Sequence, residues 1–150
     1  AGQSGESSTL VSLEPGTGAR EVLASGTFAG QSPYFQTLLF TRGQGESLEL
    51  FAVCLTSHTT RRLFASSPSA RLRSSPAGFS ASGTDLVTVV LDPAGGESLL
   101  MYDLMRDVPR EVPLPGGLHL AGGLEWAGTN VLVPIENRQN LAFDTMLVGR

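Results

Sequence analysis

The chain repeats itself, and this repetition constrains its fold more than any other feature. The string G-E-S-L occurs at residues 45–48 and 96–99, and a degraded copy, G-E-S-S, occurs at residues 5–8. Each copy precedes a short apolar run, a polar turn and a second apolar run led by arginine. Because a repeated sequence unit folds as a repeated structural unit, these copies predict a stack of similar β-units.

A second repeated string lies between the copies of the first. Residues 32–40 align without a gap on residues 80–88 and on residues 125–133, which gives periods of 48 and 45 residues. Units of about 40–50 residues that contain only strands have the size of β-propeller blades, each a sheet of about four antiparallel strands. The sequence therefore predicts an all-β fold of propeller blades. A β-sandwich is the alternative all-β fold, but it does not explain the period.

The predicted strands divide the chain into four parts of a single propeller segment. We predict a partial blade over residues 1–25, complete blades over 26–66 and 67–115, and a second partial blade over 116–150. These strands amount to about three blades, whereas propeller rings have about four to eight. We therefore expect the segment to belong to a larger ring, completed by the rest of a longer chain or by association of copies into a homo-oligomer.

Two stretches do not fit the blade pattern cleanly. Pro134 falls inside a predicted central strand, and because proline removes a ladder hydrogen bond, we expect a β-bulge or a shorter strand there. Residues 66–75 are predicted to form a long loop inserted on one face of the molecule. The predicted strands cover residues 9–13, 20–24, 27–30, 38–42, 48–55, 62–65, 73–79, 85–91, 99–105, 111–114, 123–126, 131–136 and 141–148.

The composition excludes several classes of protein. Hydrophobic residues make up 41% of the chain and charged residues 16%, which excludes a disordered chain. The net charge of −4 argues against a nucleic-acid partner. No apolar run reaches the roughly 18 residues of a membrane helix, so we expect no membrane span. The one cysteine, Cys54, lies in an apolar strand and is predicted to be a buried thiol rather than a nucleophile.

The residue types that carry catalysis do not occur here in a catalytic arrangement. The two histidines, His58 and His119, have no nucleophile and no further metal ligands at a suggestive spacing. The serines of the G-E-S-L strings lack the G-x-S-x-G elbow of a hydrolase. We therefore predict no catalytic residues, no cofactor and no metal ligands, and a chain that is not itself an enzyme.

Five residues are the candidates for contact with a partner protein. Tyr34 and Trp126 occupy corresponding turns of different blades, where aromatic side chains either pack between blades or form a patch for a partner. Arg71 and Arg73 lie in the stretch predicted as an inserted loop. His119 lies in a glycine-rich connection between blades, and such a connection can line the central face of a propeller.

The repeats resemble a known family. Residues 32–40 are similar to the S-P-D-G-x-x-[IL]-[AV]-[FY] signature of the TolB-like propeller repeat, a relative of WD-type repeats. Residues 80–87 keep the serine, the glycine and the apolar strand, and residues 100–104 resemble the strand of that family that ends near an aspartate. The resemblance covers residues 27–150, although no copy keeps the Asp-Gly pair of the turn.

The resemblance implies a function as well as a fold. Propellers of this kind bind partner proteins, often in the bacterial periplasm or cell envelope. They also occur as the non-catalytic gating domain of prolyl-oligopeptidase-like enzymes. We therefore predict a non-enzymatic scaffold for protein interactions. The alternatives are a propeller that accompanies a hydrolase whose catalytic part lies outside this chain, and a structural subunit of a larger envelope assembly. Fold alone does not decide among the three.

Overall fold

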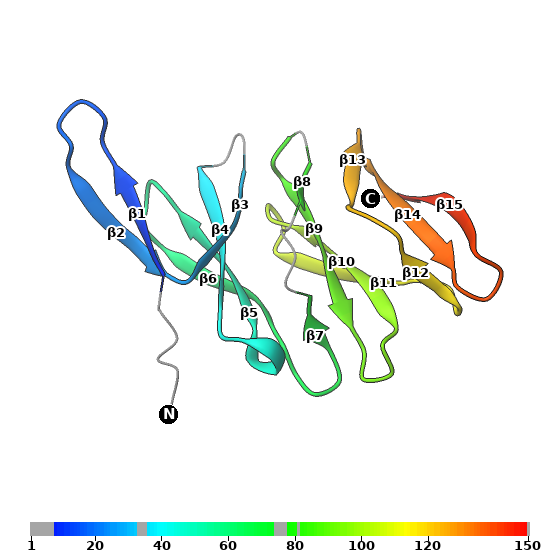
Figure 1. Ribbon diagram of the computed structural model, residues 1–150. Helices are drawn as coiled ribbons and strands as arrows, with labels where there is room; N and C mark the ends of the chain where they lie inside the picture. The colour runs from blue at the N-terminus through cyan, green and yellow to red at the C-terminus, as the bar shows by residue number, and fades with distance from the viewer. Residues whose placement is uncertain (1–7, 33–35, 74–77, 81, 150) are drawn as a thin grey trace.

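The computed structural model describes residues 8–32, 36–73, 78–80 and 82–149. In this part of the chain the regular structure consists of β-strands and one short 3₁₀ turn, η1 (Gly45–Ser47). The strands form antiparallel sheets that stand side by side in chain order, as Figure 1 shows. This arrangement confirms the predicted all-β fold of propeller blades.

Each sheet corresponds to one blade or to part of one. Blade 1 contains two strands and blade 2 contains four, and neighbouring strands in the sequence pair with each other throughout. The strands of these two blades are β1 (Thr9–Leu13), β2 (Arg20–Ser25), β3 (Thr27–Gln31), β4 (Thr37–Arg42), β5 (Glu49–Cys54) and β6 (Thr60–Ala65). All six strands overlap the strands predicted from the sequence.

In blades 3 and 4 the innermost position holds two short strands. Both pair with the same long neighbour, which is β9 in blade 3 and β14 in blade 4. The strands of these blades are β7 (Arg71–Leu72), β8 (Gly78–Phe79), β9 (Asp85–Leu91), β10 (Glu97–Asp103), β11 (Val108–Pro113), β12 (Leu118–Leu120), β13 (Glu125–Ala127), β14 (Asn130–Asn137) and β15 (Ala142–Gly149).

The predicted insertion at residues 66–75 is wrong. Arg71 and Leu72 form β7 and pair with Leu91 and Val90 at one end of β9. The backbone N–H of Arg73 continues this pairing by donating to the carbonyl of Val89 at 2.9 Å. Residues 71–73 therefore belong to the inner side of blade 3, and the sequence pattern hid this because a strand of two residues is too short to be recognised. Residues 74 and 75 lie outside the described residues.

The bulge predicted at Pro134 is also wrong. Strand β14 pairs with β15 without a register shift, and it is longer than predicted. The carbonyl of Pro134 accepts a hydrogen bond from the N–H of Ala121 at 2.8 Å, on the side away from β15. Because the nitrogen and oxygen of a strand residue point to the same side, the nitrogen of Pro134 faces the gap between β12 and β13. The missing donor therefore costs no ladder hydrogen bond.

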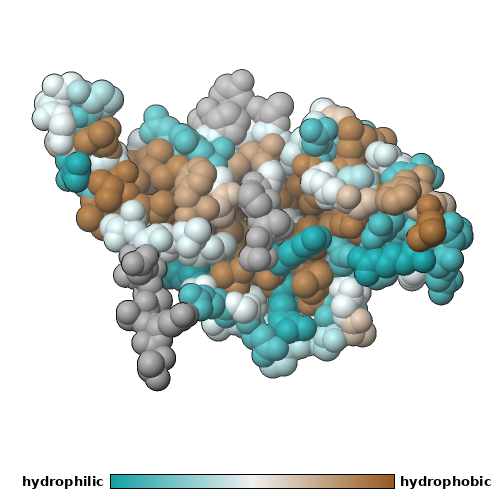
Figure 2. Space-filling view, in the orientation of Figure 1, coloured by the Kyte–Doolittle hydropathy of each residue, from teal (hydrophilic) through white to brown (hydrophobic). Residues whose placement is uncertain are grey.

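The hydrophobic core lies between the blades. Leu39 of β4 packs with Leu72, Leu86 and Tyr102 of blade 3. Val87 of β9 packs in a second cluster with residues of blade 4, including Val131 and Val133. A smaller cluster joins blades 1 and 2. Hydrophobic side chains also reach the surface at both lateral ends of the row, as Figure 2 shows.

Polar contacts repeat at the outer side of each interface. At each of the three interfaces between blades, a residue near the start of one blade's outermost strand contacts the next blade. The contact lies at the end of the next blade's third strand or in the hairpin after that strand. The pairs are Glu21 with His58 at 3.1 Å, Arg61 with Asp107 at 3.2 Å, and Arg110 with the carbonyl of Gly149. The repeated arginine of the sequence therefore joins successive blades where it is Arg61 or Arg110.

The turns fall into two groups at opposite ends of the blades. The turn from β13 to β14 and the hairpin from β10 to β11 lie at the upper end in Figure 1, as do the end of β3, the start of β4, the end of β8 and the start of β9. The connections from β4 to β5, from β9 to β10 and from one blade to the next lie at the lower end. Any binding surface made by loops must therefore belong to one end or the other.

Candidate functional site

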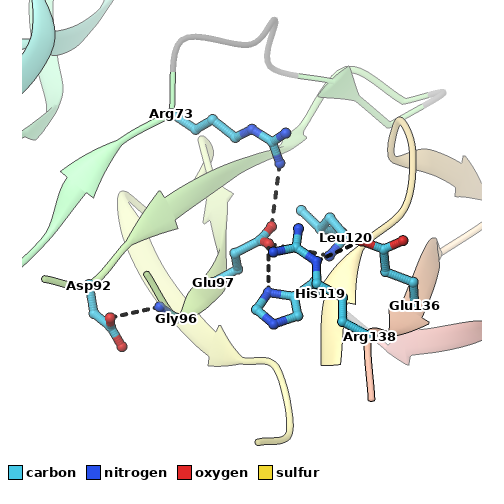
Figure 3. Close-up of polar contacts among 8 residues, drawn as sticks. All are labelled: Arg73, Asp92, Gly96, Glu97, His119, Leu120, Glu136 and Arg138. Atoms are coloured by element: carbon cyan, nitrogen blue, oxygen red, sulfur yellow. Dashed lines mark hydrogen bonds and ion pairs between the residues drawn. The ribbon is translucent and has the colours of Figure 1, made fainter. Parts of the chain in front are cut away.

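Arg73 and His119 meet at a buried carboxylate at the lower end of blades 3 and 4 (Figure 3). The side chain of Glu97, at the start of β10, is only 8% exposed. Its Oε2 lies 3.3 Å from Nη1 of Arg73, and its Oε1 lies 3.5 Å from Nδ1 of His119. The backbone N–H of Leu120 donates to the same Oε1 at 3.4 Å. Glu97 therefore links β7, β10 and β12.

The corresponding glutamate of blade 2 has a different environment. Glu46 lies in η1, and its side chain is 78% exposed. Its Oε1 accepts a hydrogen bond from Nη1 of Arg71 at 2.8 Å. The two G-E-S-L strings thus each provide a glutamate that binds an arginine at or next to β7. The repeat marked both glutamates, but we interpreted the strings as hairpin turns and did not predict this pairing.

A groove of about 660 Å³ opens beside Arg71 between blades 2 and 3. We call it the lower groove. Its walls are β3, the β4–β5 turn, β7 with the adjoining Arg73, and the end of β9. Phe28 of β3 contributes an aromatic side chain, and the residue is 56% exposed. The groove therefore combines an apolar surface with the Arg71–Glu46 ion pair.

The β4–β5 turn that forms one wall of the lower groove needs glycine. Gly43 has φ +85°, and a Cβ added to it would lie 2.3 Å from the carbonyl oxygen of Ser47. Ser47 in turn donates its hydroxyl to the carbonyl of Gln44 at 2.9 Å. A residue with a side chain at position 43 would therefore force this wall to move.

A second groove of about 560 Å³ lies at the upper end between blades 3 and 4. We call it the upper groove. It is lined by Trp126 of β13, by Tyr102 of β10, by Val108 and Arg110 of β11, and by Arg106 in the hairpin between them, with a few neighbouring residues. Arg106 is paired only weakly, since its Nε lies 3.9 Å from Oδ2 of Asp103.

Trp126 also contributes to the packing between blades. Its Nε1–H donates to the carbonyl of Gly78 in β8 at 3.2 Å. The ring packs against the cluster that joins blades 3 and 4. One side of Trp126 therefore stabilises the interface while the residue also lines the upper groove.

Tyr102 connects the upper groove to the core between blades 2 and 3. Its hydroxyl donates to Oδ1 of Asp107, which also binds Arg61. The guanidinium carbon of Arg61 lies 5.9 Å from the centre of the Tyr102 ring. Burial of the phenol, with the nearby carboxylate of Asp107, raises the pKa of Tyr102 to about 12.

The structure does not place the five predicted partner-binding residues on one surface. Arg71, Arg73 and His119 lie at the lower end, and the guanidinium of Arg73 is directed to Glu97. Trp126 lies at the upper end. Tyr34 is outside the described residues. The prediction therefore separates into two surfaces, one at each end of the blades.

Cys54 and the acidic residues do not form a metal site in the part of the chain that the structure describes. There, no group of three or more His, Cys, Asp or Glu side chains is arranged to hold a metal ion. The Sγ of Cys54, at the end of β5, lies 3.1 Å from Oγ1 of Thr56. Hydrogen bonds from Ser57 and Thr56 lower the pKa of this thiol to about 6. Cys54 is partly accessible, so the prediction of a buried thiol is wrong.

Comparison with known proteins defines the class by fold alone. No family model matches the sequence. No curated protein matches it either. Among the described residues, no helix is long and apolar enough to cross a membrane.

Solved structures with a similar fold are β-propeller domains and related enzymes. The β-propeller domain of the Trilobed protease from Pyrococcus furiosus has a TM-score of 0.73 over 95% of this chain, at 15% identity. The acylaminoacyl peptidase of Pyrococcus horikoshii has a TM-score of 0.69 over 95% of the chain, at 13% identity. An oligogalacturonate lyase in complex with manganese has a TM-score of 0.60 over 88% of the chain, at 13% identity.

The chain is shorter than the proteins it resembles. It covers 46%, 26% and 40% of the length of these three structures, respectively. At these identities the likeness shows the fold and no more. The chain is therefore a set of propeller blades, similar in arrangement to about half of the Trilobed protease propeller domain.

Proposed function

We propose that this chain is a non-catalytic part of a β-propeller that binds a partner protein through the upper groove. The observation that carries the proposal is the set of side chains in that groove. Trp126, Arg106 and Arg110 line this groove, and tryptophan and arginine are among the residues most enriched at binding hot spots. Tyr102 also lines it but is only 6% exposed. Val108 adds apolar surface, with an exposed fraction of 52%.

The groove also has the free donors that a partner needs. Arg106 is 80% exposed, and its contact with Asp103 is too long for a strong hydrogen bond. An exposed ion pair of this kind contributes at most about 1 kcal/mol, so a partner carboxylate or carbonyl can replace it at little cost. Trp126 is held in place by the carbonyl of Gly78, so its ring is already ordered before a partner arrives.

Selection from a displayed library of random peptides tests this proposal. The protein is compared with the double variant Arg106→Ser, Val108→Ser, which changes two exposed groove residues and leaves Trp126 in its packing position. We expect peptides that bind the unchanged protein and bind the double variant at least about tenfold more weakly. Arg20→Ser, at an exposed position on β2, is the matched control and should bind like the unchanged protein.

Two results would contradict the proposal. One is a selection in which no peptide is enriched. The other is a set of enriched peptides that bind the double variant as well as they bind the unchanged protein.

A second candidate function is a propeller that accompanies a hydrolase. It is favoured by the printed descriptions of two of the similar structures, a protease and an acylaminoacyl peptidase. The mass of the polypeptide from the natural source, measured after denaturation, tests this candidate. A polypeptide larger than 15.7 kDa whose further sequence contains a G-x-S-x-G elbow would favour the hydrolase. A polypeptide of 15.7 kDa in a native particle whose mass is a small multiple of that value would favour a scaffold whose ring is closed by copies of the chain.

The assignment to the TolB-like family and to the cell envelope is part of the same proposal. The TolB-like family is supported by the resemblance of residues 32–40 and 100–104 alone. The cell-envelope location, and with it a structural role in an envelope assembly, follows from that resemblance.

A further inference from the structure

We propose that the lower groove binds the carboxyl terminus of a polypeptide whose last side chain is apolar. The site is independent of the upper groove, because the two lie at opposite ends of the blades and have no lining residue in common. Arg71 would bind the terminal carboxylate, and Phe28 would contact the last side chain.

The guanidinium of Arg71 is available to a ligand. Among the described residues its hydrogen bond to Glu46 is the one it makes, and a guanidinium carries five N–H donors in a planar fork. Glu46 is mostly exposed and lies in a turn, so its ion pair with Arg71 is of the weak, solvent-screened kind. Glu46 therefore occupies the place that a ligand carboxylate would take, and an incoming carboxylate can displace it.

The same groove has an apolar part. Phe28 is a large hydrophobic residue that is 56% exposed, and it lies on the inner strand of blade 2. Leu48, Leu72 and Leu91 complete the apolar lining between the two blades. An apolar surface that is open to solvent beside a basic group is complementary to a ligand that carries both features.

The presence of a cation and an apolar surface in one groove favours a chain terminus. In the last residue of a polypeptide the carboxylate and the side chain are attached to the same Cα. An internal Asp or Glu, by contrast, carries its charge on the side chain, so the apolar group must come from a neighbouring residue. A planar guanidinium also binds a free carboxylate with two parallel hydrogen bonds. An acidic sugar would bind Arg71 and could stack its C–H face on Phe28, but it would leave the leucines without an aliphatic partner, so it is the competing ligand in the test below.

Two peptides that differ only at their last group test the inference. The probes are acetyl-Gly-Ser-Gly-Ala-Phe with a free carboxyl terminus and the same peptide as a terminal amide. Their affinities for the protein are measured by isothermal titration calorimetry. We expect the free acid to bind at least about tenfold more tightly than the amide, because the hydrogen bonds to a charged group are lost in the amide.

Variants then assign the effect to the groove. Arg71→Gln should weaken the free acid to the level of the amide, and Phe28→Ala should weaken both peptides. Glu46→Gln should tighten the free acid severalfold, because the competing carboxylate is removed. Arg138→Gln is the matched control. Arg138 is paired with Glu136 and lines neither groove, so this change should leave both affinities unaltered. Glu46→Gln is exposed, so it tests the inference even where Arg71→Gln fails to fold.

Several outcomes would overturn the inference. Equal affinity of acid and amide would do so, as would an unchanged affinity in Glu46→Gln, or tighter binding of trigalacturonate than of the free acid. None of them bears on the upper groove. The double variant Arg106→Ser, Val108→Ser should bind the free acid normally, so the two proposals can fail separately.

Discussion

Leu39, Val87 and Leu132 occupy the same place in three successive repeats, but their surroundings differ. Each lies on the second strand of its blade and faces the blade that would follow. Leu39 is 0% exposed and Val87 is 1% exposed, because blades 3 and 4 cover them. Leu132 lies on the face of β14 opposite the core, next to Leu147, which is 58% exposed.

The same contrast runs along the whole strands. In β9 both faces are buried, so its first six residues are all buried. In β14 burial alternates, because only the face toward blade 3 is covered. The comparison teaches that burial in a repeat fold is set by the neighbouring repeats rather than by the residue itself. An apolar residue such as Leu132 keeps the sequence of a core position while it is only partly buried.

Truncation of the equivalent leucines should have unequal effects. Leu39→Ala removes a fully buried side chain and leaves a cavity between blades 2 and 3, so we expect a loss of about 2–5 kcal/mol in the free energy of unfolding. Leu132→Ala should cost less, about 1–2 kcal/mol, because Leu132 is only partly buried. Urea denaturation followed by circular dichroism measures both.

A similar loss for both leucines would break the comparison. It would mean that the face of β14 is covered in solution, by another copy or by a further blade. Sedimentation of the protein in the same buffer would then identify an association between copies.

The two glutamates of the G-E-S-L strings sharpen the comparison at the lower end. Glu97→Ala should lower the free energy of unfolding by roughly 1–3 kcal/mol, since it leaves Arg73, His119 and the N–H of Leu120 without a buried acceptor. Glu46→Ala should change it by no more than about 0.5 kcal/mol, because its ion pair with Arg71 is exposed. Equal effects in the same denaturation experiment would show that Glu97 is not the link between the blades that its contacts indicate.

The smallest expected effect concerns pH and Tyr102. The pKa of Tyr102 is raised to about 12 from an ordinary value of 10.0, so folding favours the neutral phenol. Its contribution to stability is complete below pH 10 and is lost as the pH rises toward 12. Denaturation at a series of alkaline pH values should therefore show a decline that is smaller in Tyr102→Phe. An identical decline in the variant would place the titrating group elsewhere.

The sequence predicted the strands better than it predicted their interruptions. The β-branched run that forms β9 was predicted at its observed bounds, Asp85–Leu91. The short strands β7 and β12 were missed, since two or three residues carry too little alternation to be recognised. Pro134 was misjudged because the side on which its nitrogen lies depends on the pairing of β12 and β13, and sequence alone does not give that pairing.

The sequence did not predict where the candidate residues lie relative to one another. Arg71, Arg73 and Trp126 line grooves in the structure, and their contact with a partner stays a prediction. Their distribution over opposite ends of the blades follows from the alternating direction of the strands, which places the turn before β14 and the connection before β7 far apart. The roles of Glu46 and Glu97 depend on contacts between residues about 25 positions apart in the chain, and no local pattern reports such contacts.

The short inner strands of blade 4 also bear on aggregation. The exposed edge of a sheet offers a row of unpaired donors and acceptors on which a foreign strand can assemble, and long regular edges are the most hazardous. On the inner side of blade 4 this edge is made of β12 and β13, each three residues long. With the nitrogen of Pro134 in the gap between β12 and β13, the inner edge of blade 4 has no continuous ladder to offer. This edge is thereby a poor template for fibril growth, whatever surface the outer strands present.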